Sequence, residues 1–199
     1  MNPNSSDPTV QPVPASVVEQ VDAADVTLSN PKTAVISLGS NLGNRLETLQ
    51  GAVDALEDTP GLRVKAVSPV YETEPWGVDP GSQPSYFNAV AVIRTTLPHG
   101  SLLERAQAVE EAFHRVRDER WGPRTLDVDI VAYAGVVSAD PELTLPHPHA
   151  HERAFVLAPW HDVDPEAELP GQGPVDELLS ALAGDGLTRR EDLELRLPE

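Results

Sequence analysis

The amino-acid sequence predicts an α+β fold in which an antiparallel sheet carries two helices on one face. Two observations lead to this prediction. Four segments between residues 33 and 133 are short apolar runs or alternate between apolar and polar side chains, as β-strands do. Two further segments repeat their apolar residues at helical spacing, which gives the element order β-α-β-β-α-β.

The first half of this pattern consists of a strand, a helix and a second strand. The apolar run AVISLG, residues 34–39, ends at a glycine, as expected for a buried strand. Asn44 is a suitable cap for the next helix, because Glu47 stands three residues later and a helical apolar spacing follows. This helix is expected to end near Pro60. Residues 62–71 begin with alternating apolar and basic side chains, which indicates a half-exposed strand.

The second half begins with an irregular segment, residues 71–85, which contains three prolines and two glycines. Long loops of this kind in compact domains are commonly functional. A buried strand is predicted over residues 86–95, a helix from Pro98 to about His114, and a fourth strand over residues 126–133. The complete order is that of a ferredoxin-like β-α-β-β-α-β sandwich.

The regions outside this core differ in composition. Residues 1–30 are rich in Pro, Ser, Asn and Asp and lack basic and aromatic residues, so we expect a disordered tail. The domain itself is expected to span residues 31–185, with C-terminal helices added around residues 153–160 and 175–182. Residues 186–199 are expected to form an acidic, solvated C-terminal extension.

Composition restricts the classes of function. The 32 acidic residues outnumber the 14 basic ones, and the formal net charge of −18 argues against binding to nucleic acid or to an anionic membrane. No apolar run approaches the roughly 20 residues that a bilayer requires, and no secretion signal follows Met1. We therefore expect a soluble, cytoplasmic monomer. The absence of cysteine excludes disulfides, thiolate metal sites and thiol nucleophiles.

A pair of carboxylates marks the fourth predicted strand. Asp127 and Asp129 stand two residues apart, so their side chains leave the same face while Leu126, Val128 and Ile130 point into the core. Their Cα atoms would lie about 7 Å apart. Such a pair is suited to holding Mg²⁺ together with substrate phosphates. The alternative interpretation is a pair of solvated strand residues.

A basic segment stands immediately before the two carboxylates. Arg115, Arg117, Arg120 and Arg124 occur within ten positions, although the chain as a whole is strongly acidic. Arginine binds phosphate oxygens with two parallel hydrogen bonds and does not lose its charge. Trp121, which stands among them, offers a flat face for a heteroaromatic ring. The alternative is a surface loop in which these arginines pair with neighbouring acidic residues.

Other polar motifs are less specific. Residues 39–45, GSNLGNR, favour a tight turn and a helix cap over an anion site, because they lack the Lys and Ser/Thr of a P-loop. Glu110 is interpreted as an ordinary exposed glutamate of the second helix. His147, His149 and His151 alternate among prolines, a spacing that fits zinc sites poorly, so a single histidine that donates to phosphate is favoured.

Five motifs follow one another along the chain: LGSNLGNR, YETEPWG, YFNAVAVIRT, RWGPRTLDVDI and LPHPHAHERAFVLAP. In this order and at these separations they closely resemble the 6-hydroxymethyl-7,8-dihydropterin pyrophosphokinase family of folate biosynthesis. The resemblance covers about residues 33–182, and RWGPRTLDVDI is its most specific part. It implies a ferredoxin-like fold and transfer of diphosphate from ATP, the co-substrate, to the pterin hydroxymethyl group, which releases AMP.

The resemblance also implies roles for individual residues. Two Mg²⁺ ions are expected on Asp127 and Asp129, which match the metal-binding pair of the family. The positions that match the pterin pocket are Thr73, Tyr86, Asn88, Trp121, Asp127 and Phe155. The positions that match contacts to ATP are Gln107, Glu110, Arg115, Arg117, Arg120, Trp121, Arg124, Ile130, Thr144, His147 and Arg153. The expected catalytic residues are Arg115, Arg124, Asp127 and Asp129.

Two positions depart from the family pattern. Pro148 stands where a tyrosine commonly follows the histidine of the PH motif, and Glu142 aligns with a nucleotide contact that is arginine in some members.

Two other functions fit parts of the sequence pattern. A nucleotide-sugar transferase using D-x-D is disfavoured, because no nucleotide-binding α/β domain precedes the motif. A ferredoxin-like module that binds a heterocycle would leave the two aspartates beside four arginines unexplained.

Overall fold

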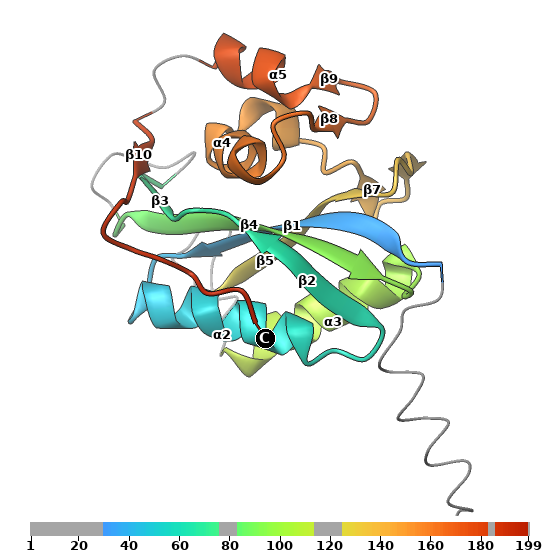
Figure 1. Ribbon diagram of the computed structural model, residues 1–199, viewed down its shortest axis with the longest axis horizontal. Coiled ribbons are helices and arrows are strands. Elements are labelled where there is room, and N and C mark those ends of the chain that lie inside the picture. The colour runs from blue at the N-terminus through green and yellow to red at the C-terminus, as the bar shows by residue number, and fades with distance from the viewer. Residues whose placement is uncertain (1–29, 76–82, 114–124, 183–185, 199) are drawn as a thin grey trace, which may run out of the picture.

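The computed structural model describes residues 30–75, 83–113, 125–182 and 186–198. Its centre is a six-stranded sheet with two helices on one face and further helices on the other (Figure 1). The α+β fold predicted from the sequence is confirmed. In the described part of the chain, none of the helices combines the length and apolar character needed to cross a membrane.

Every strand pair in the main sheet is antiparallel. The sheet order is β10-β3-β4-β1-β5, and β2 also pairs with β4. Taken together, β2 and β3 correspond to the second predicted strand, so the four predicted strands lie in the order second, third, first, fourth, as in the ferredoxin-like sandwich. The strands are β1 (Lys32–Ser40), β2 (Leu62–Val67), β3 (Tyr71–Thr73), β4 (Tyr86–Thr95), β5 (Asp127–Tyr133) and β10 (Thr188–Arg189).

Two helices, α2 (Arg45–Glu57) and α3 (His99–Ala112), cover one face of this sheet (Figure 1). The predicted cap of α2 is present, since the Asn44 side chain accepts a hydrogen bond from the backbone N–H of Glu47 at 3.4 Å. Gly43, just before the cap, has a positive φ of 65°, a conformation that glycine adopts without strain. The GSNLGNR motif therefore contains the tight turn and helix cap favoured by its sequence.

The opposite face of the sheet is covered by α4, and α5 packs on the far side of α4 (Figure 1). Both helices were expected, at residues 153–160 and 175–182. The elements that follow β5 are β6 (Ser138–Ala139), β7 (Thr144–Leu145), the 3-10 helix η1 (Ala150–Glu152), α4 (Ala154–Val163), β8 (Glu168–Leu169), β9 (Gly173–Pro174) and α5 (Val175–Ala181).

Alternate residues of the central strands belong to different layers. In β1, Ile36 and Leu38 are fully buried in the apolar cluster beneath α2 and α3. Val35, one position away, belongs to a second cluster that includes Trp160 of α4. This alternation follows from the two-residue period of a strand. It places the polar residues at the ends of the strands on the α4 side, where the candidate site lies.

The prediction of one continuous strand over residues 62–71 was wrong. The ladder is interrupted at Ser68, whose hydroxyl accepts the Val90 N–H while its own N–H donates to the Val90 carbonyl, both at 2.9 Å. Pro69 follows and has no N–H to donate. Pairing with β4 then resumes at Tyr71, so β3 takes the first three residues of the segment predicted as an irregular loop.

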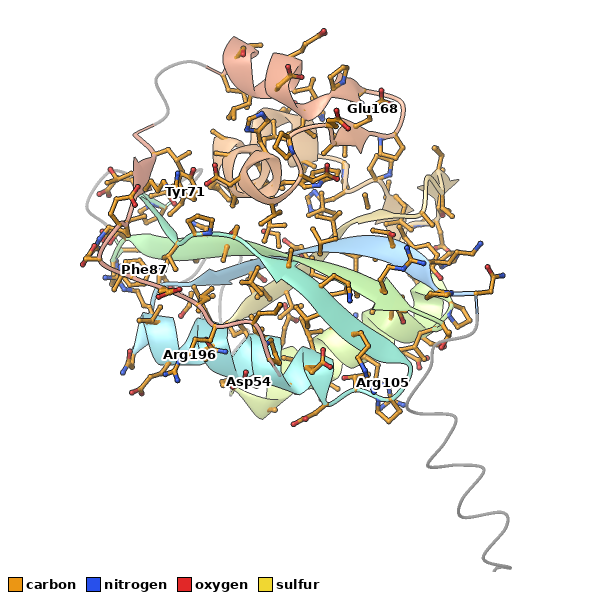
Figure 2. All side chains as sticks on the ribbon, viewed as in Figure 1. Asp54, Tyr71, Phe87, Arg105, Glu168 and Arg196 are labelled. Carbon is orange, nitrogen blue, oxygen red and sulfur yellow. The ribbon has the colours of Figure 1, made fainter. Side chains whose placement is uncertain are left out.

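Residues 186–198, here called the C-terminal strap, are packed more closely than expected for a solvated extension. Their strand β10 pairs with β3, and Leu195 is only 8% exposed within the cluster beneath α2. The Arg196 backbone N–H donates to Gln50 Oε1 of α2 at 2.8 Å. Figure 2 shows Arg196 over α2, near Asp54. The domain boundary at residue 185 stays a prediction.

Candidate active site

A cavity of about 250 Å³ opens on the α4 side of the sheet. Its walls come from the ends of β1, β3, β4 and β5 and from the chain that leads into α4. The lining residues are Ser37, Gly39, Thr73, Glu74, Pro75, Gln83, Tyr86, Asn88, Asp127, Asp129, His147, Arg153 and Phe155. Eight of these are site residues expected from the sequence, and they meet here although they span more than eighty positions of the chain.

The two aspartates of β5 face this cavity together. The cavity is lined by Asp127 and Asp129, whereas Val128 and Ile130 lie in the opposite cluster, as the two-residue spacing predicted. A guanidinium nitrogen of Arg153 lies 3.8 Å from Asp129 Oδ2. Negative charge thus gathers at the cavity wall, with the cation of Arg153 beside it.

The chemistry of this wall fits a hard cation. Two carboxylates on one strand face supply the oxygen ligands that Mg²⁺ prefers. In the described part of the chain, no group of three or more His, Cys, Asp or Glu side chains is placed to hold a metal. Two carboxylates alone leave most of an octahedral shell to water and substrate oxygens, which is how Mg²⁺ is commonly held beside phosphates.

Glu110 of α3 lies behind the aspartate pair. It is 3% exposed, and its Oε1 accepts the backbone N–H of Val128 at 2.8 Å. The interpretation as an ordinary exposed glutamate was therefore wrong. A buried backbone N–H needs an acceptor, and Glu110 supplies one at the residue between Asp127 and Asp129.

Asn88 and Thr73 form a buried polar pair at the other end of the cavity. The Asn88 side-chain amide donates to Thr73 Oγ1 at 2.9 Å, and both residues are less than 9% exposed. Gly39 lies opposite, where an added Cβ would be 3.4 Å from Asn88 Oδ1 and 3.8 Å from the Asp127 Cβ. Because Gly39 has no side chain, the space between the amide and the aspartate is open.

The cavity wall that faces the sheet is formed by the segment before α4 and by the first turn of α4. Burial, followed by the nearby charges of Arg153 and His149, lowers the pKa of His147 to about 4. The imidazole is therefore neutral at pH 7 and offers one donor and one acceptor. The positive charge of this wall resides on Arg153, whose guanidinium lies 5.7 Å from the Phe155 ring centre.

Several predicted contacts lie away from the cavity lining. Gln107 is exposed on α3, and Thr144 in β7 donates its hydroxyl to the Asp140 carbonyl at 3.1 Å. The side chain of Ile130 is packed in the apolar cluster. Any contact between Ile130 and a nucleotide would therefore be made by its main chain. The predicted arginines and tryptophan of the basic segment lie outside the described residues; they are Arg115, Arg117, Arg120, Trp121 and Arg124.

Sequence reasoning missed some lining residues. Ser37 could have been found, because it shares the strand face of Gly39. Glu74, Pro75 and Gln83 stand in the irregular segment that the sequence marks as functional, but this segment has no period that would single out individual residues.

Glu72, in the middle of β3, is the centre of an ion network near the cavity. Its carboxylate accepts hydrogen bonds from the Ser85 hydroxyl at 2.5 Å, from Arg45 at 3.2 Å and from Arg190. The Ser85 hydrogen bond, followed by the two arginines, lowers the pKa of Glu72 below its ordinary value. This glutamate is therefore ionised at neutral pH.

Comparison with known proteins assigns the family. The family model for 7,8-dihydro-6-hydroxymethylpterin-pyrophosphokinase (HPPK) matches residues 35–165. The chain belongs to this family. Relatives of the HPPK chain include proteins named 2-amino-4-hydroxy-6-hydroxymethyldihydropteridine pyrophosphokinase. That of Methylorubrum extorquens is 45% identical over 159 residues, which cover 79% of this chain and 98% of the relative. That of Mycobacterium leprae is 46% identical over 172 residues, which cover 81% and 87%.

Solved structures support the fold of this HPPK chain. Wild-type Plasmodium falciparum HPPK-DHPS with pteroate has a TM-score of 0.63 at 13% identity, over 80% of this chain and 48% of that chain. A structure titled as HPPK-DHPS in complex with substrates has a TM-score of 0.62 at 12% identity, over 81% and 47%. The chain thus spans about half the length of these proteins.

Proposed function

We propose that this chain transfers diphosphate from ATP to 6-hydroxymethyl-7,8-dihydropterin in folate biosynthesis, with release of AMP. The observation that carries the proposal is the meeting, in one cavity, of two kinds of group. One wall has the aspartate pair Asp127 and Asp129, suited to metal-bound phosphates. The other has the buried pair Asn88 and Thr73, suited to the polar edge of a heterocycle.

The pterin is assigned to the end of the cavity at β3 and β4. Asn88 carries both donors and an acceptor, which match the alternating groups on a pterin edge. Thr73 holds the Asn88 amide in place through the 2.9 Å hydrogen bond. Phe155 stacks on one ring face and Trp121 on the other, and Tyr86 borders the pocket. Gly39 leaves the space that the ring occupies.

ATP is assigned to the aspartate pair and the wall of Arg153 and His147. Two Mg²⁺ ions are proposed on Asp127 and Asp129, where they would neutralise charge on the phosphate oxygens. Arg153 adds a permanent positive charge, and neutral His147 adds a hydrogen bond. The remaining proposed ATP contacts are Gln107, Glu110, Arg115, Arg117, Arg120, Trp121, Arg124, Ile130 (through its main chain) and Thr144.

The reaction is a substitution at the β-phosphorus of ATP. The pterin hydroxyl oxygen bonds to this phosphorus and loses its proton to water, and the bond from the β-phosphorus to the oxygen bridging the α-phosphate breaks. AMP leaves with the electron pair of that bond. Such transfers depend mainly on alignment and on stabilisation of charge. We assign charge stabilisation to Arg115 and Arg124, and orientation of the pterin hydroxyl to Asp127.

The wider organisation follows the same proposal. We assign the activity to residues 31–185, acting as a cytoplasmic monomer, with residues 1–30 as a tail outside this domain. The formal net charge of −18 supports small-molecule substrates over nucleic-acid or membrane partners.

The test is a coupled assay for AMP with ATP and Mg²⁺, in the presence and absence of the pterin. AMP should form only when the pterin is added. Asp129→Asn should lower kcat by about 100-fold or more, because it removes a charge at the phosphates while preserving side-chain shape. Asp176→Asn, an exposed aspartate of α5, is the matched control and should leave kcat unchanged. AMP formation independent of pterin, or full activity of Asp129→Asn, would contradict the proposal.

A further inference from the structure

We propose that Arg190 of the C-terminal strap is a positioning residue for the pterin end of the cavity. This inference rests on the proposed function, because the pterin is the ligand whose binding Arg190 affects. Arg190 lies outside the residues that the family model matches, 35–165. It acts from behind the cavity wall, through Glu72.

Four residues form what is here called the rear clamp: Arg45, Glu72, Ser85 and Arg190. The Glu72 carboxylate accepts hydrogen bonds from all three of the others. Arg45 also donates to the Ser85 carbonyl at 2.7 Å. The clamp thus joins α2, β3, the residue before β4 and the strap in one charge-assisted network.

The clamp lies on the face of β3 and β4 opposite the cavity. Glu72 pairs with Phe87, and Thr73 pairs with Tyr86. Phe87 belongs to the apolar cluster, with the guanidinium groups of Arg45 and Arg190 at 3.6 Å and 5.3 Å from its ring centre. Figure 2 shows Phe87 and Tyr71 at the same end of the sheet.

From this position, the rear clamp determines where the neighbouring residues of the cavity wall lie. Thr73, Glu74 and Pro75 follow Glu72 directly, and Gln83 stands two residues before Ser85; all four line the cavity. The hydrogen bond from Ser85 to Glu72 therefore joins the strand that leads into Thr73, Glu74 and Pro75 to the residues that follow Gln83. A shift of the clamp moves both relative to Asn88.

Arg190 ties the clamp to the strap. Its backbone N–H donates to the Val70 carbonyl at 2.9 Å, and its side chain also bonds Asp192 at 2.9 and 2.8 Å. The burial of Leu195 anchors the strap further along. An exposed ion pair contributes little on its own. Arg190 differs because it bridges an anchored strap and a carboxylate that closes the base of the pocket wall.

The experiment compares KM for the two substrates in the full-length chain. Arg190→Ala should raise KM for the pterin by roughly five- to tenfold, less than the roughly 100-fold that a misplacement of about 1 Å can cost, because Arg45 and Ser85 still hold Glu72. KM for ATP should stay within about twofold, because the ATP wall is held by other elements. Arg190→Lys should give an intermediate KM, since lysine restores the charge without the paired donors.

Arg196→Ala is the matched control. Arg196 belongs to the same strap and carries the same charge, but it is exposed and contacts Gln50 through its backbone. Its removal should leave both KM values unchanged. Glu72→Gln combined with Arg190→Ala should raise KM for pterin by less than the product of the two single effects, because both act through one contact.

Three results separate the outcomes. If Arg190→Ala lowers Tm but leaves KM for pterin unchanged, the residue is only structural and the inference is wrong. If the two KM values rise equally, the effect is general and the inference is equally wrong. If the unmodified chain forms no AMP on addition of pterin, the proposed function fails instead, before any variant is compared.

Discussion

Asn88 illustrates how one buried side chain distinguishes the two ends of the cavity. It is 4% exposed in the middle of the sheet, where an amide is costly to bury unless it is hydrogen-bonded. Thr73 accepts one of its N–H groups. A polar residue retained at such a place, facing a cavity, is suited to recognising the polar edge of a ligand.

Asn88→Leu should weaken pterin binding by about 1–3 kcal/mol, because polar groups of the ring would be buried without partners. ATP binding should change less, since Asn88 lies at the end of the cavity away from His147 and Arg153. Calorimetric titration of each ligand into the variant measures both effects. A variant that bound pterin normally and lost ATP would show that this strand belongs to the nucleotide site.

His147 shows why charge and hydrogen bonding are divided between neighbouring residues. Its lowered pKa, about 4, keeps the ring neutral at pH 7, so it adds no positive charge to the site. That charge comes from Arg153, beside Asp129. The two residues thus place a neutral hydrogen-bonding ring and a permanent cation on the same cavity wall.

At the scale of elements, a hydrogen bond between α3 and β5 helps to hold the aspartate pair in position. Glu110 reaches from α3 to the Val128 N–H, and the two aspartates flank that residue. Their separation is set by the strand, and the start of the strand is held on one side by its pairing with β1 and on the other by this hydrogen bond. Its loss therefore affects stability and catalysis together.

Glu110→Ala should lower the free energy of unfolding by about 1–3 kcal/mol, because it leaves a buried N–H without its acceptor. The kcat should also fall, as Asp127 and Asp129 shift with Val128. Denaturant unfolding and the AMP assay measure the two effects. Glu111→Ala, an exposed neighbour on the same helix, should change neither. Equal behaviour of the two variants would mean that the Glu110 contact does not hold the strand.

The elements also show what the sequence could predict. The strands β1 and β4 follow from short apolar runs, and the common face of the two aspartates in β5 follows from the period of two; both are local properties of the sequence. The burial of Glu110 does not, because its partner is 18 residues away and lies on another element. The break before β3 depends on Ser68 bonding across to Val90. The strap was missed because β10 has only two residues and no period.

The whole molecule carries a formal net charge of −18, which is large for 199 residues. Charge of one sign destabilises a compact state by self-repulsion. The rear clamp and the ion pair of Arg189 with Glu191 offset this only locally, because the molecule has few basic residues. Repulsion is therefore expected to outweigh the ion pairs in the response of the protein to salt.

Raising NaCl from about 0.1 to about 1 M reduces the Debye length from about 10 to about 3 Å. The Tm of the metal-free protein should consequently rise by a few degrees, as repulsion is screened more than short ion pairs are. Differential scanning calorimetry in EDTA at the two concentrations measures this. A fall in Tm would show that the ion-pair networks, including the rear clamp, contribute more to stability than repulsion removes.

The two layers on either side of the sheet impose different requirements on adjacent residues. In β1 and β5, the positions that face α2 and α3 form one apolar core, and the positions between them face α4. At one end of the strands these α4-facing positions line the cavity, as Gly39 and Asp129 do, and at the other end they form the second apolar core, as Val35 and Val131 do. Evolution of a new substrate preference is therefore confined to the cavity-lining positions at one end of the strands, where a substitution disturbs neither core.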